Sequence, residues 1–558
     1  MSAIQPELEN PAGTDFFNNY DIEKGNIDSN ISCTINGTDN TDAEIFEEQE
    51  IYEIHSAAKK KEPFAHFGKF IVAALIYAAV FTFCRYKVNS GILIPAEYLS
   101  TAAILLYGVK VLGYKIKPGF IFALASYVLL GFNMCTTEVS TLIIFDQIGG
   151  ILILFAGLVH ECYNDKNWGF GKYFVALHAF FWYTVIYVAD PFIDYSRIKN
   201  KSTKSKTGLY ILIGALMVIP VALIVLSLLW SADMMFKKAL DDFFVKINFR
   251  DCLKIACLFL TVCLAAYAFL KRMSKKNINE EVHEIKGVNS VIGITFNSVL
   301  TFIYLVFSVF QFVFLFFRSG LPEGYTYASY AHTGFYQLVA VSILNLLIVF
   351  ISKVVFSKSK ILDVILLLTS LCTFIMIASS FYRMILYIDV YRLTELRVLT
   401  LWALTVITLI MAVICAYIVK PEIPVAKTIT VIVTVMYLIL AYSHPTRIIA
   451  DYNMKEFLRT GEGDLYYVSR LCEASDAFMY AESVVDTSNT GNLQGEALHE
   501  YIDARDRYFR GIRFYGEFYN KDNHENSFER FRNYNFACAK EGRAYNDYVA
   551  KNGEPYDL

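Results

Sequence analysis

Charged residues are scarce in this sequence, and its long polar stretches are confined to the two ends. Asp, Glu, Lys and Arg make up 18% of the 558 residues, whereas hydrophobic residues make up 55% and mean hydropathy is +0.41. A soluble protein has no interior large enough to hide so much apolar surface. The formal net charge of −3 gives no basic field that would attract nucleic acid. The composition therefore indicates an integral membrane protein whose main partner is the lipid bilayer.

Catalytic and metal-binding patterns are also missing. No Walker A loop, HExxH zinc motif or GxSxG nucleophile elbow occurs in the chain. The eleven Cys form no CxxC pair and no Cys/His cluster with metal-ligand spacing. We therefore expect no cofactor and no metal, and the sequence leans away from an enzyme. The sequence leaves open whether Cys472 and Cys538 form a disulfide.

The first part of the chain, residues 1–62, is polar and acidic and has no regular apolar period. It lacks the apolar core behind a basic start that marks a cleaved signal peptide. A segment of this composition cannot bury enough apolar surface to offset its ordering entropy. We expect a disordered acidic tail.

Residues 63–443 are dominated by long apolar runs. A bilayer core about 30 Å thick needs about 20 residues of helix, and about eleven runs are long enough. Each must be helical, because an unpaired backbone amide in hydrocarbon costs several kcal/mol. The predicted spans are 67–84, 92–113, 118–136, 139–160, 208–231, 251–270, 293–317, 333–356, 361–382, 398–419 and 425–443. The expected fold is an all-α, polytopic transmembrane helix bundle.

Segment 171–189 is apolar enough to span, yet it is dense in aromatic residues. If it crossed the bilayer, the basic run 197–206 would lie opposite the other basic loops, against the positive-inside rule. We therefore predict an interfacial helix at 171–189. The resulting topology puts the N-terminus in the cytoplasm and the C-terminus outside.

The C-terminal part, residues 444–558, is polar enough to form a small soluble helical module. Six apolar residues share one face of its main predicted helices: Leu498, Tyr501, Ile502, Phe509, Ile512 and Tyr519. This stripe is either the core of the module or its contact with the membrane domain. The alternative is a binding surface for an envelope component or a partner protein.

Polar side chains inside the predicted spans are candidates for function, because they are costly in lipid. Glu97 and the pair Asp146 and Gln147 lie in the second and fourth spans, with no evident Lys or Arg partner inside the membrane. They are either a proton or cation relay, or they are solvated or hydrogen-bonded within the bundle. The amides of Asn297, Gln311 and Asn345 are best interpreted as bonds between helices.

A dense set of charged and aromatic residues joins the ninth and tenth spans. Arg383, Tyr387, Tyr391 and Glu395 recur every four residues, so they would share one face of a continuous helix. Asp389 and Arg392, and likewise Arg392 and Glu395, lie within reach of each other. The set also contains Thr394 and Arg397. It predicts either a ligand clamp or a rigid structural corner.

Two segments resemble the hallmarks of an uncharacterised bacterial multi-spanning family, known only as a domain of unknown function and common in Firmicutes and Actinobacteria. The first pattern, Tyr-Ala-x-Tyr-Ala-x-x-Gly-Phe, is matched by Tyr327, Ala328, Tyr330, Ala331, Gly334 and Phe335. The second, Tyr-Gly-Leu-Thr-x-Leu-Arg, is matched by Tyr391, Leu393, Thr394, Leu396 and Arg397. Arg392 replaces the Gly of that pattern and places a bulky charge where a flexible corner is expected. The resemblance covers roughly residues 200–480 and implies a shared membrane fold in the bacterial cell membrane, but no activity.

Three functions are compatible with these observations. The first is a transport-like or envelope accessory protein that uses the intramembrane carboxylates and the charged corner. The second is a sensory or scaffolding protein that acts through its C-terminal module. The third is a membrane-embedded transferase, because such enzymes often work with lone Asp or Glu residues.

Overall fold

The computed structural model describes residues 64–165, 168, 170–199, 249–274, 287–317, 335–471, 493–519 and 527–553, with the single positions 225, 229 and 235. Within these residues the chain is helical, apart from one isolated bridge between Val288 and Phe356. The membrane-domain helices are α2 (Phe67–Arg85), α3 (Leu93–Val111), α4 (Pro118–Asn133), α5 (Ser140–Cys162), α6 (Phe170–Ile186), η1 (Tyr187–Ala189), α7 (Asp190–Lys199), α10 (Phe249–Ser274), α11 (Ser290–Phe317), α13 (Phe335–Val355), α14 (Lys360–Tyr391), α15 (Glu395–Val419) and α16 (Val425–Tyr442). The C-terminal helices are α17 (Pro445–Thr460), α18 (Leu465–Leu471), α20 (Glu496–Gly511), α21 (Arg513–Phe518), α22 (Ser527–Arg532) and α23 (Phe536–Asn552).

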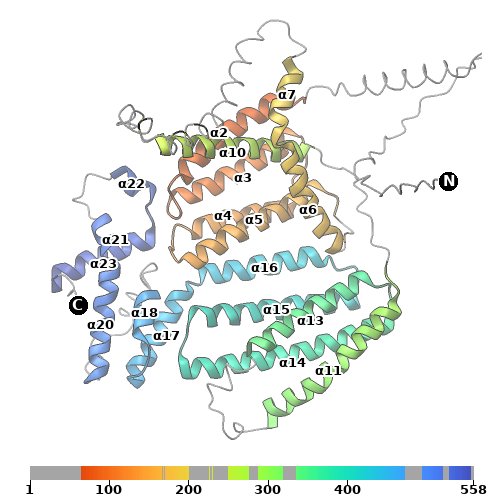
Figure 1. Ribbon diagram of the computed structural model, residues 1–558, viewed down its shortest axis with the longest axis vertical. Helices are drawn as coiled ribbons and strands as arrows, with labels where there is room; N and C mark the ends of the chain where they lie inside the picture. The colour runs from red at the N-terminus through yellow and green to blue at the C-terminus, as the bar shows by residue number, and fades with distance from the viewer. Residues whose placement is uncertain are drawn as a thin grey trace, which may run out of the picture. The chain divides into compact units, whose positions relative to one another are not determined.

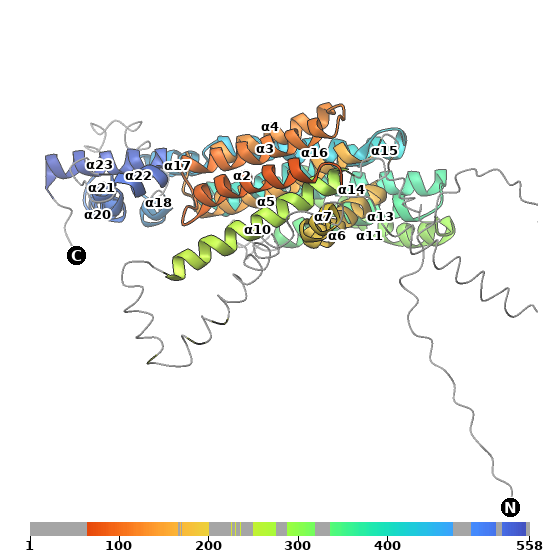
Figure 2. The ribbon, with the colours of Figure 1, turned by 90° about the horizontal axis from the view of Figure 1, so that it is seen from above.

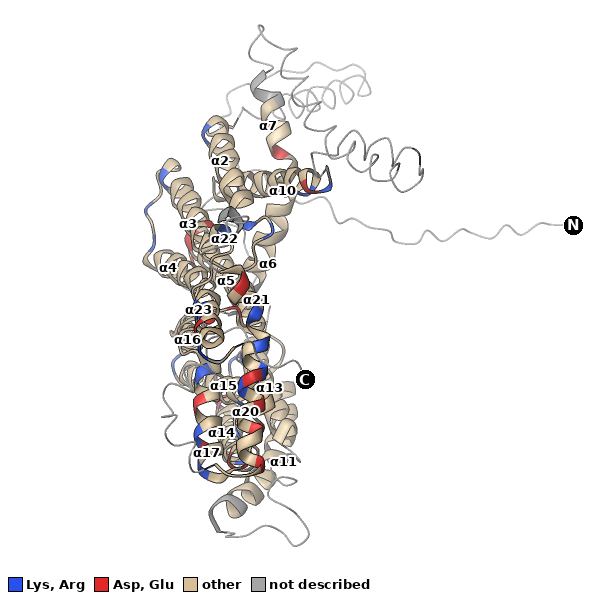
Figure 3. Cartoon of the chain, turned by 90° about the vertical axis from the view of Figure 1, so that its left-hand side faces the viewer, with Lys and Arg blue, Asp and Glu red and all other residues tan. Residues whose placement is uncertain are grey.

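The predicted all-α polytopic bundle is confirmed. Nine helices among the described residues are long and apolar enough to cross a membrane, and eight of them coincide with predicted spans. Large apolar side chains point outward as they would toward lipid; Phe302 and Phe310 on α11 are 68% and 71% exposed. Figure 3 shows charged residues gathered on C-terminal helices such as α20 and near helix ends, while the bundle helices are mostly uncharged along their lengths.

Three predicted spans differ from these nine helices. Segment 208–231 lies outside the described residues, apart from the single positions 225 and 229. Helix α4 has 16 residues, about 24 Å of helix, which is short for a hydrocarbon core of about 30 Å. Helix α3 has 19 residues, but Pro95, Glu97 and Lys110 lower its hydropathy.

Helix α6 differs from its neighbours in direction. By length and composition, Gly171–Tyr195 is the ninth possible span. In Figures 1 and 2, α6 runs crosswise to α4, α5 and α16. Its continuation α7 is tied to the end of α10, because the Lys271 ammonium lies 2.5 Å from Asp190 and also contacts Asp194.

The bundle helices pack in two groups. Helices α2, α3, α4 and α5 contact one another in sequence and α10 packs against α2 and α3, whereas α11, α13, α14 and α15 form the second set. Helix α16 contacts α4 and α5 in the first group and α15 in the second. It lies between the two groups in Figure 1. A change in the position of α16 would therefore alter its contacts with both helix groups.

The C-terminal helices have a core of their own. Tyr501, Phe509 and Ile512 of the predicted stripe are buried there together with Phe457 of α17 and Tyr545 of α23. The stripe is thus a core rather than an open surface. Cys538 carries a free thiol, so the disulfide considered from the sequence is not formed at this residue; Cys472 lies outside the described residues.

The same helices are bonded to two loops of the membrane domain. The backbone N–H of Ile92 donates to the Tyr534 carbonyl at 2.8 Å, and that of Phe536 donates to the Cys135 carbonyl at 3.0 Å. The Asn535 amide donates to the carbonyl of Thr137 at 3.0 Å. These contacts fix α21–α23 to the loops that follow α2 and α4.

Candidate functional site

The Asp146 carboxylate on α5 is completely buried. Its Oδ2 accepts a hydrogen bond from Asn133 Nδ2 at the end of α4, at 2.8 Å. Its Oδ1 accepts from the Tyr437 hydroxyl of α16 at 2.6 Å. Among the described residues no Lys, Arg or His lies within ion-pair distance of this carboxylate. Asp146 therefore joins three helices through neutral partners.

The Tyr437 hydroxyl has a second acceptor in the same place. Its oxygen lies 3.4 Å from the backbone carbonyl of Leu142, one turn before Asp146. When Asp146 is ionised, Tyr437 donates its proton to the carboxylate. When Asp146 is protonated, the acid can donate to the Tyr437 oxygen, and Tyr437 can donate to Leu142. The geometry accommodates both protonation states without moving a helix.

Small residues allow the helices around Asp146 to approach one another. A Cβ at Gly131 would lie 2.5 Å from the ring of Tyr98. Tyr98 stacks on Tyr127 with ring centroids 4.3 Å apart, and Gly150 lies against both rings. Close contact through small residues is the usual way in which membrane helices pack. The result is a buried site at the junction of α3, α4, α5 and α16.

Glu97 on α3 is buried on the same side of the bundle. Its Oε2 lies 3.9 Å from the guanidinium of Arg85, the last residue of α2. The expectation that Glu97 has no cationic partner was therefore wrong. The pairing is readable in the sequence, because Arg85 ends one span just before Glu97 enters the next.

The other intramembrane polar residues connect helices of the second group. Asn297 donates to Ser352 at 3.1 Å, and Asn345 donates to Thr373 at 3.1 Å. Gln311 accepts a 2.6 Å hydrogen bond from Ser379. These contacts join α11, α13 and α14, as expected for interhelical bonds. Gln147 is half-buried, and its side chain makes no hydrogen bond with the described residues.

The charged set between α14 and α15 is a corner rather than a continuous helix. Helix α14 ends at Tyr391 and α15 begins at Glu395, so Arg383, Tyr387 and Tyr391 follow one another on α14, whereas Glu395 lies on the next helix. Arg383 is buried within α14. Glu395 uses its backbone N–H to donate to the Tyr467 hydroxyl at 2.9 Å.

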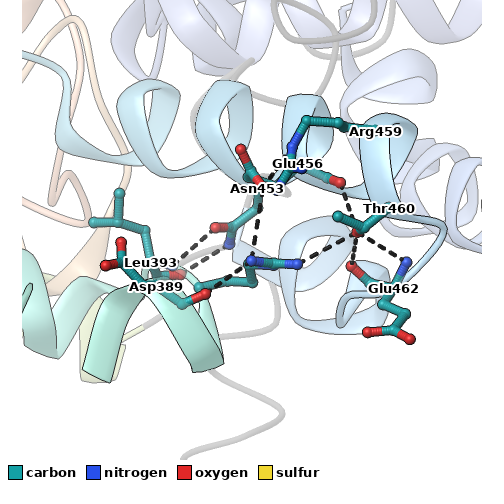
Figure 4. A network of polar contacts seen from close by, with 8 residues as sticks. Asp389, Leu393, Asn453, Glu456, Arg459, Thr460 and Glu462 are labelled. Carbon is teal, nitrogen blue, oxygen red and sulfur yellow. Dashed lines mark hydrogen bonds and ion pairs between the residues drawn. The ribbon is translucent and has the colours of Figure 1, made fainter. Parts of the chain in front are cut away.

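Helix α17 holds this corner in place, as Figure 4 shows. Asn453 accepts from the Leu393 N–H at 2.9 Å and donates to the Leu393 carbonyl at 2.8 Å. The Arg392 guanidinium donates to the Asp389 carbonyl at 2.9 Å and lies 3.6 Å from the Glu456 carboxylate. The predicted side-chain pairs of Arg392 with Asp389 and Glu395 are therefore replaced by a bond to the α14 backbone and an ion pair with α17.

Arg392 adopts a backbone conformation that favours glycine. Its φ is +64° and its ψ is −177°, a region in which a side chain costs of order 1–3 kcal/mol. A Gly, which the hallmark pattern that this segment resembles has here, would adopt this conformation without that cost. In this chain the Arg392 contacts to Asp389, Glu456 and Thr460 offset part of that cost.

The family-motif residues are only partly described. Phe335 is buried at the start of α13 against α14 and α15, close to Thr394 and Arg397 of the second motif. Tyr327, Tyr330 and Gly334 lie outside the described residues. Phe335, the last residue of the first hallmark pattern, thus meets the second hallmark segment at one end of α13, α14 and α15.

A second buried charge cluster escaped the sequence reasoning. Asp165, after α5, lies 2.7 Å from His160 Nδ1 and 3.0 Å from the Lys427 ammonium. Burial acts to raise the pKa of Asp165, but the hydrogen bonds and charges of His160 and Lys427 outweigh it and hold the pKa below its usual range. The cluster ties the start of α16 to the end of α5.

No group of three or more metal-ligating side chains occurs within the described ranges. The arrangement around Asp146 is suited to binding and releasing a proton, and the corner is suited to holding the ends of three helices.

Comparison with known families gives one match, a domain of unknown function (DUF4153) across residues 120–478. The match covers more than half of the chain and agrees with the resemblance seen in the two hallmark segments. Comparison with curated proteins and with solved structures gives no match.

Proposed function

We propose that this chain, which belongs to the DUF4153 family, is a transport-like membrane protein in which Asp146 gains and loses a proton. The supporting observation is the buried Asp146 carboxyl, whose partner Tyr437 has an alternative acceptor at Leu142. An intramembrane carboxyl without a cationic partner is expensive unless it is neutralised, and such residues commonly serve proton pathways.

Trp402 provides an internal reporter for this proposal. Its ring lies 6.3 Å from that of Tyr437, and its Nε1 donates to the Met436 carbonyl at 2.9 Å. In a variant that retains only this tryptophan, we expect the fluorescence to change with pH, because the Tyr437 hydrogen bond reorients when Asp146 is protonated. D146N should abolish the change, and proteoliposomes containing D146N should carry protons no faster than empty ones.

The matched control is D363N, which removes a carboxylate paired with Lys353 in the other helix group. It should leave both the fluorescence titration and the proton flux intact. A wild-type response that persists in D146N would exclude Asp146 as the titrating group.

We further propose that the protein lies in the bacterial cell membrane with the C-terminal helices outside. Cysteines at His499 and Lys358, both exposed, test this in a background in which the exposed Cys252 and Cys257 are replaced by serine. A membrane-impermeant maleimide should label H499C in intact cells and K358C only after lysis. The reverse pattern would invert the topology.

A sensory role is the second candidate. The C-terminal helices bond to the backbone of Cys135 and Thr137, and Asn133, the partner of Asp146, ends the helix just before them. An event that shifts these helices could reach Asp146 through this short segment. In that case, detaching the C-terminal helices should alter the pH dependence of the Trp402 fluorescence.

A further inference from the structure

A cavity of about 110 Å³ lies where α13, α14 and α15 meet. It is separate from the Asp146 site, which involves α4, α5 and α16. Six of its lining residues matter for the argument: Phe335, Tyr336, Tyr387, Thr394, Arg397 and Thr400. Two of them, Thr394 and Arg397, belong to the second hallmark segment and Phe335 belongs to the first.

Arg397 gives the cavity a positive charge. Its Nη1 donates to the carbonyl of Tyr391 at 2.6 Å and to that of Arg392. Its guanidinium stacks over the Tyr387 ring, 4.4 Å from the ring centre. Within the part of the chain that the structure describes, no carboxylate lies within ion-pair distance of Arg397, and Nε and Nη2 make no hydrogen bond. One edge of the guanidinium is therefore held in place while the other remains available.

The chemistry of the cavity matches a phosphate group. A guanidinium edge presents two parallel N–H donors to a phosphate or carboxylate. Thr394 lines the same space, whereas the Thr400 hydroxyl donates to the Leu396 carbonyl at 2.6 Å. A cavity of about 110 Å³ is several times larger than the roughly 10–15 Å³ that a cavity needs to hold one water, so a phosphate group has room to enter it.

The surroundings of the cavity favour an amphiphile over a free ion. Tyr336 and Leu396 are 50% and 60% exposed, and both belong to helices that run into the bilayer. Aromatic residues at the ends of spans lie at the level of lipid headgroups. A chain attached to a bound phosphate would continue along this apolar surface.

We propose that the Arg397 cavity binds the phosphate group of an anionic lipid, with Arg397 as its principal ligand and the Tyr387 ring as the support that orients the guanidinium. The inference is independent of the proton-coupled role of Asp146.

The test uses the purified full chain in nanodiscs of a zwitterionic lipid and measures binding of a fluorescent phosphatidic acid. R397Q should weaken binding at least about tenfold, because a charge-assisted bidentate contact is lost. R397K should weaken lipid binding less, since lysine keeps the positive charge but cannot present two parallel N–H donors. The matched control R392Q removes a neighbouring arginine that instead faces Glu456 and Thr460, and should bind as the wild type does.

Three outcomes would overturn the proposal. Equal lipid binding by wild type and R397Q would exclude Arg397 as a ligand. An equal loss in R392Q would mean that the corner as a whole is responsible. Inorganic phosphate that binds as tightly as the lipid would show a free-anion site. If R397Q fails to fold, R397K against R392Q decides the question, and D146N should retain lipid binding whether or not it transports protons.

Discussion

Replacing Lys271 with methionine should destabilise the protein by about 3–5 kcal/mol, the range found when one partner of a buried ion pair is removed. The Lys271 ammonium contacts Asp190 and Asp194, and the Asp194 carboxylate is 1% exposed. Tyr267 donates to the same carboxylate at 2.8 Å. Without Lys271, the two carboxylates lose the ammonium group that contacts both of them. A large fall in the midpoint of thermal unfolding in detergent is the measurement.

The control is K353M. Lys353 pairs with Asp363 at 2.6 Å, but that carboxylate is 30% exposed, so water can solvate it after the change, and we expect a loss of about 1 kcal/mol or less. Neutralising Asp190 and Asp194 together with Lys271 should restore much of the stability. Similar losses of stability in K271M and K353M would mean that burial does not determine how much these ion pairs contribute to stability.

Replacing Gly91 with alanine should detach the C-terminal helices from the membrane domain. Gly91 has a φ of +116°, and a Cβ there would lie 2.9 Å from the Tyr534 carbonyl oxygen. Backbone strain of about 1 kcal/mol adds to a steric conflict of about 1–3 kcal/mol. Both costs act where Ile92 bonds to Tyr534.

The buried thiol of Cys538 reports this detachment. It donates to Glu138 at 3.0 Å, and burial together with the Glu138 charge raises its pKa, so the docked thiol should alkylate slowly. In G91A, alkylation should be faster by at least about tenfold, corresponding to about 1.4 kcal/mol. G113A is the control, because Gly113 has a φ of +68° but nothing within 4 Å of its Cβ position. Unchanged alkylation in G91A would contradict this account of the docking.

The membrane fold was predictable from the sequence because lipid leaves the backbone few alternatives to helix. Prediction was weaker where a helix is short or carries polar residues, as in α3 and α4. The positive-inside rule predicted an interfacial helix at 171–189, whereas Gly171–Tyr195 is long and apolar enough to span. Two basic residues near the end of α10, Lys271 and Arg272, are buried by contacts within the protein. Lys271 pairs with α7, and Arg272 lies over the ring of Tyr183 at 4.9 Å.

The candidate site was only half predictable. Asp146 is conspicuous because a carboxylate is unexpected in an apolar run, but its partners Asn133 and Tyr437 look ordinary in their own segments. Tyr437 is 291 positions away in the sequence, and no local periodicity connects such residues. A corner near Arg392 was one of the two alternatives predicted from the sequence, but the positive φ of Arg392 was not, because a non-glycine residue there hides the signal for it.

The bond between Tyr437 and Asp146 has a consequence for biosynthesis. At roughly 5–20 residues per second, the ribosome needs about 15–60 s to make the chain that separates the two residues. During that interval the newly inserted α5 holds its acid with Asn133 as a partner but without Tyr437. The first helix group therefore forms before its contacts with α16 exist. When α16 is inserted, Tyr437 becomes available to bond Asp146.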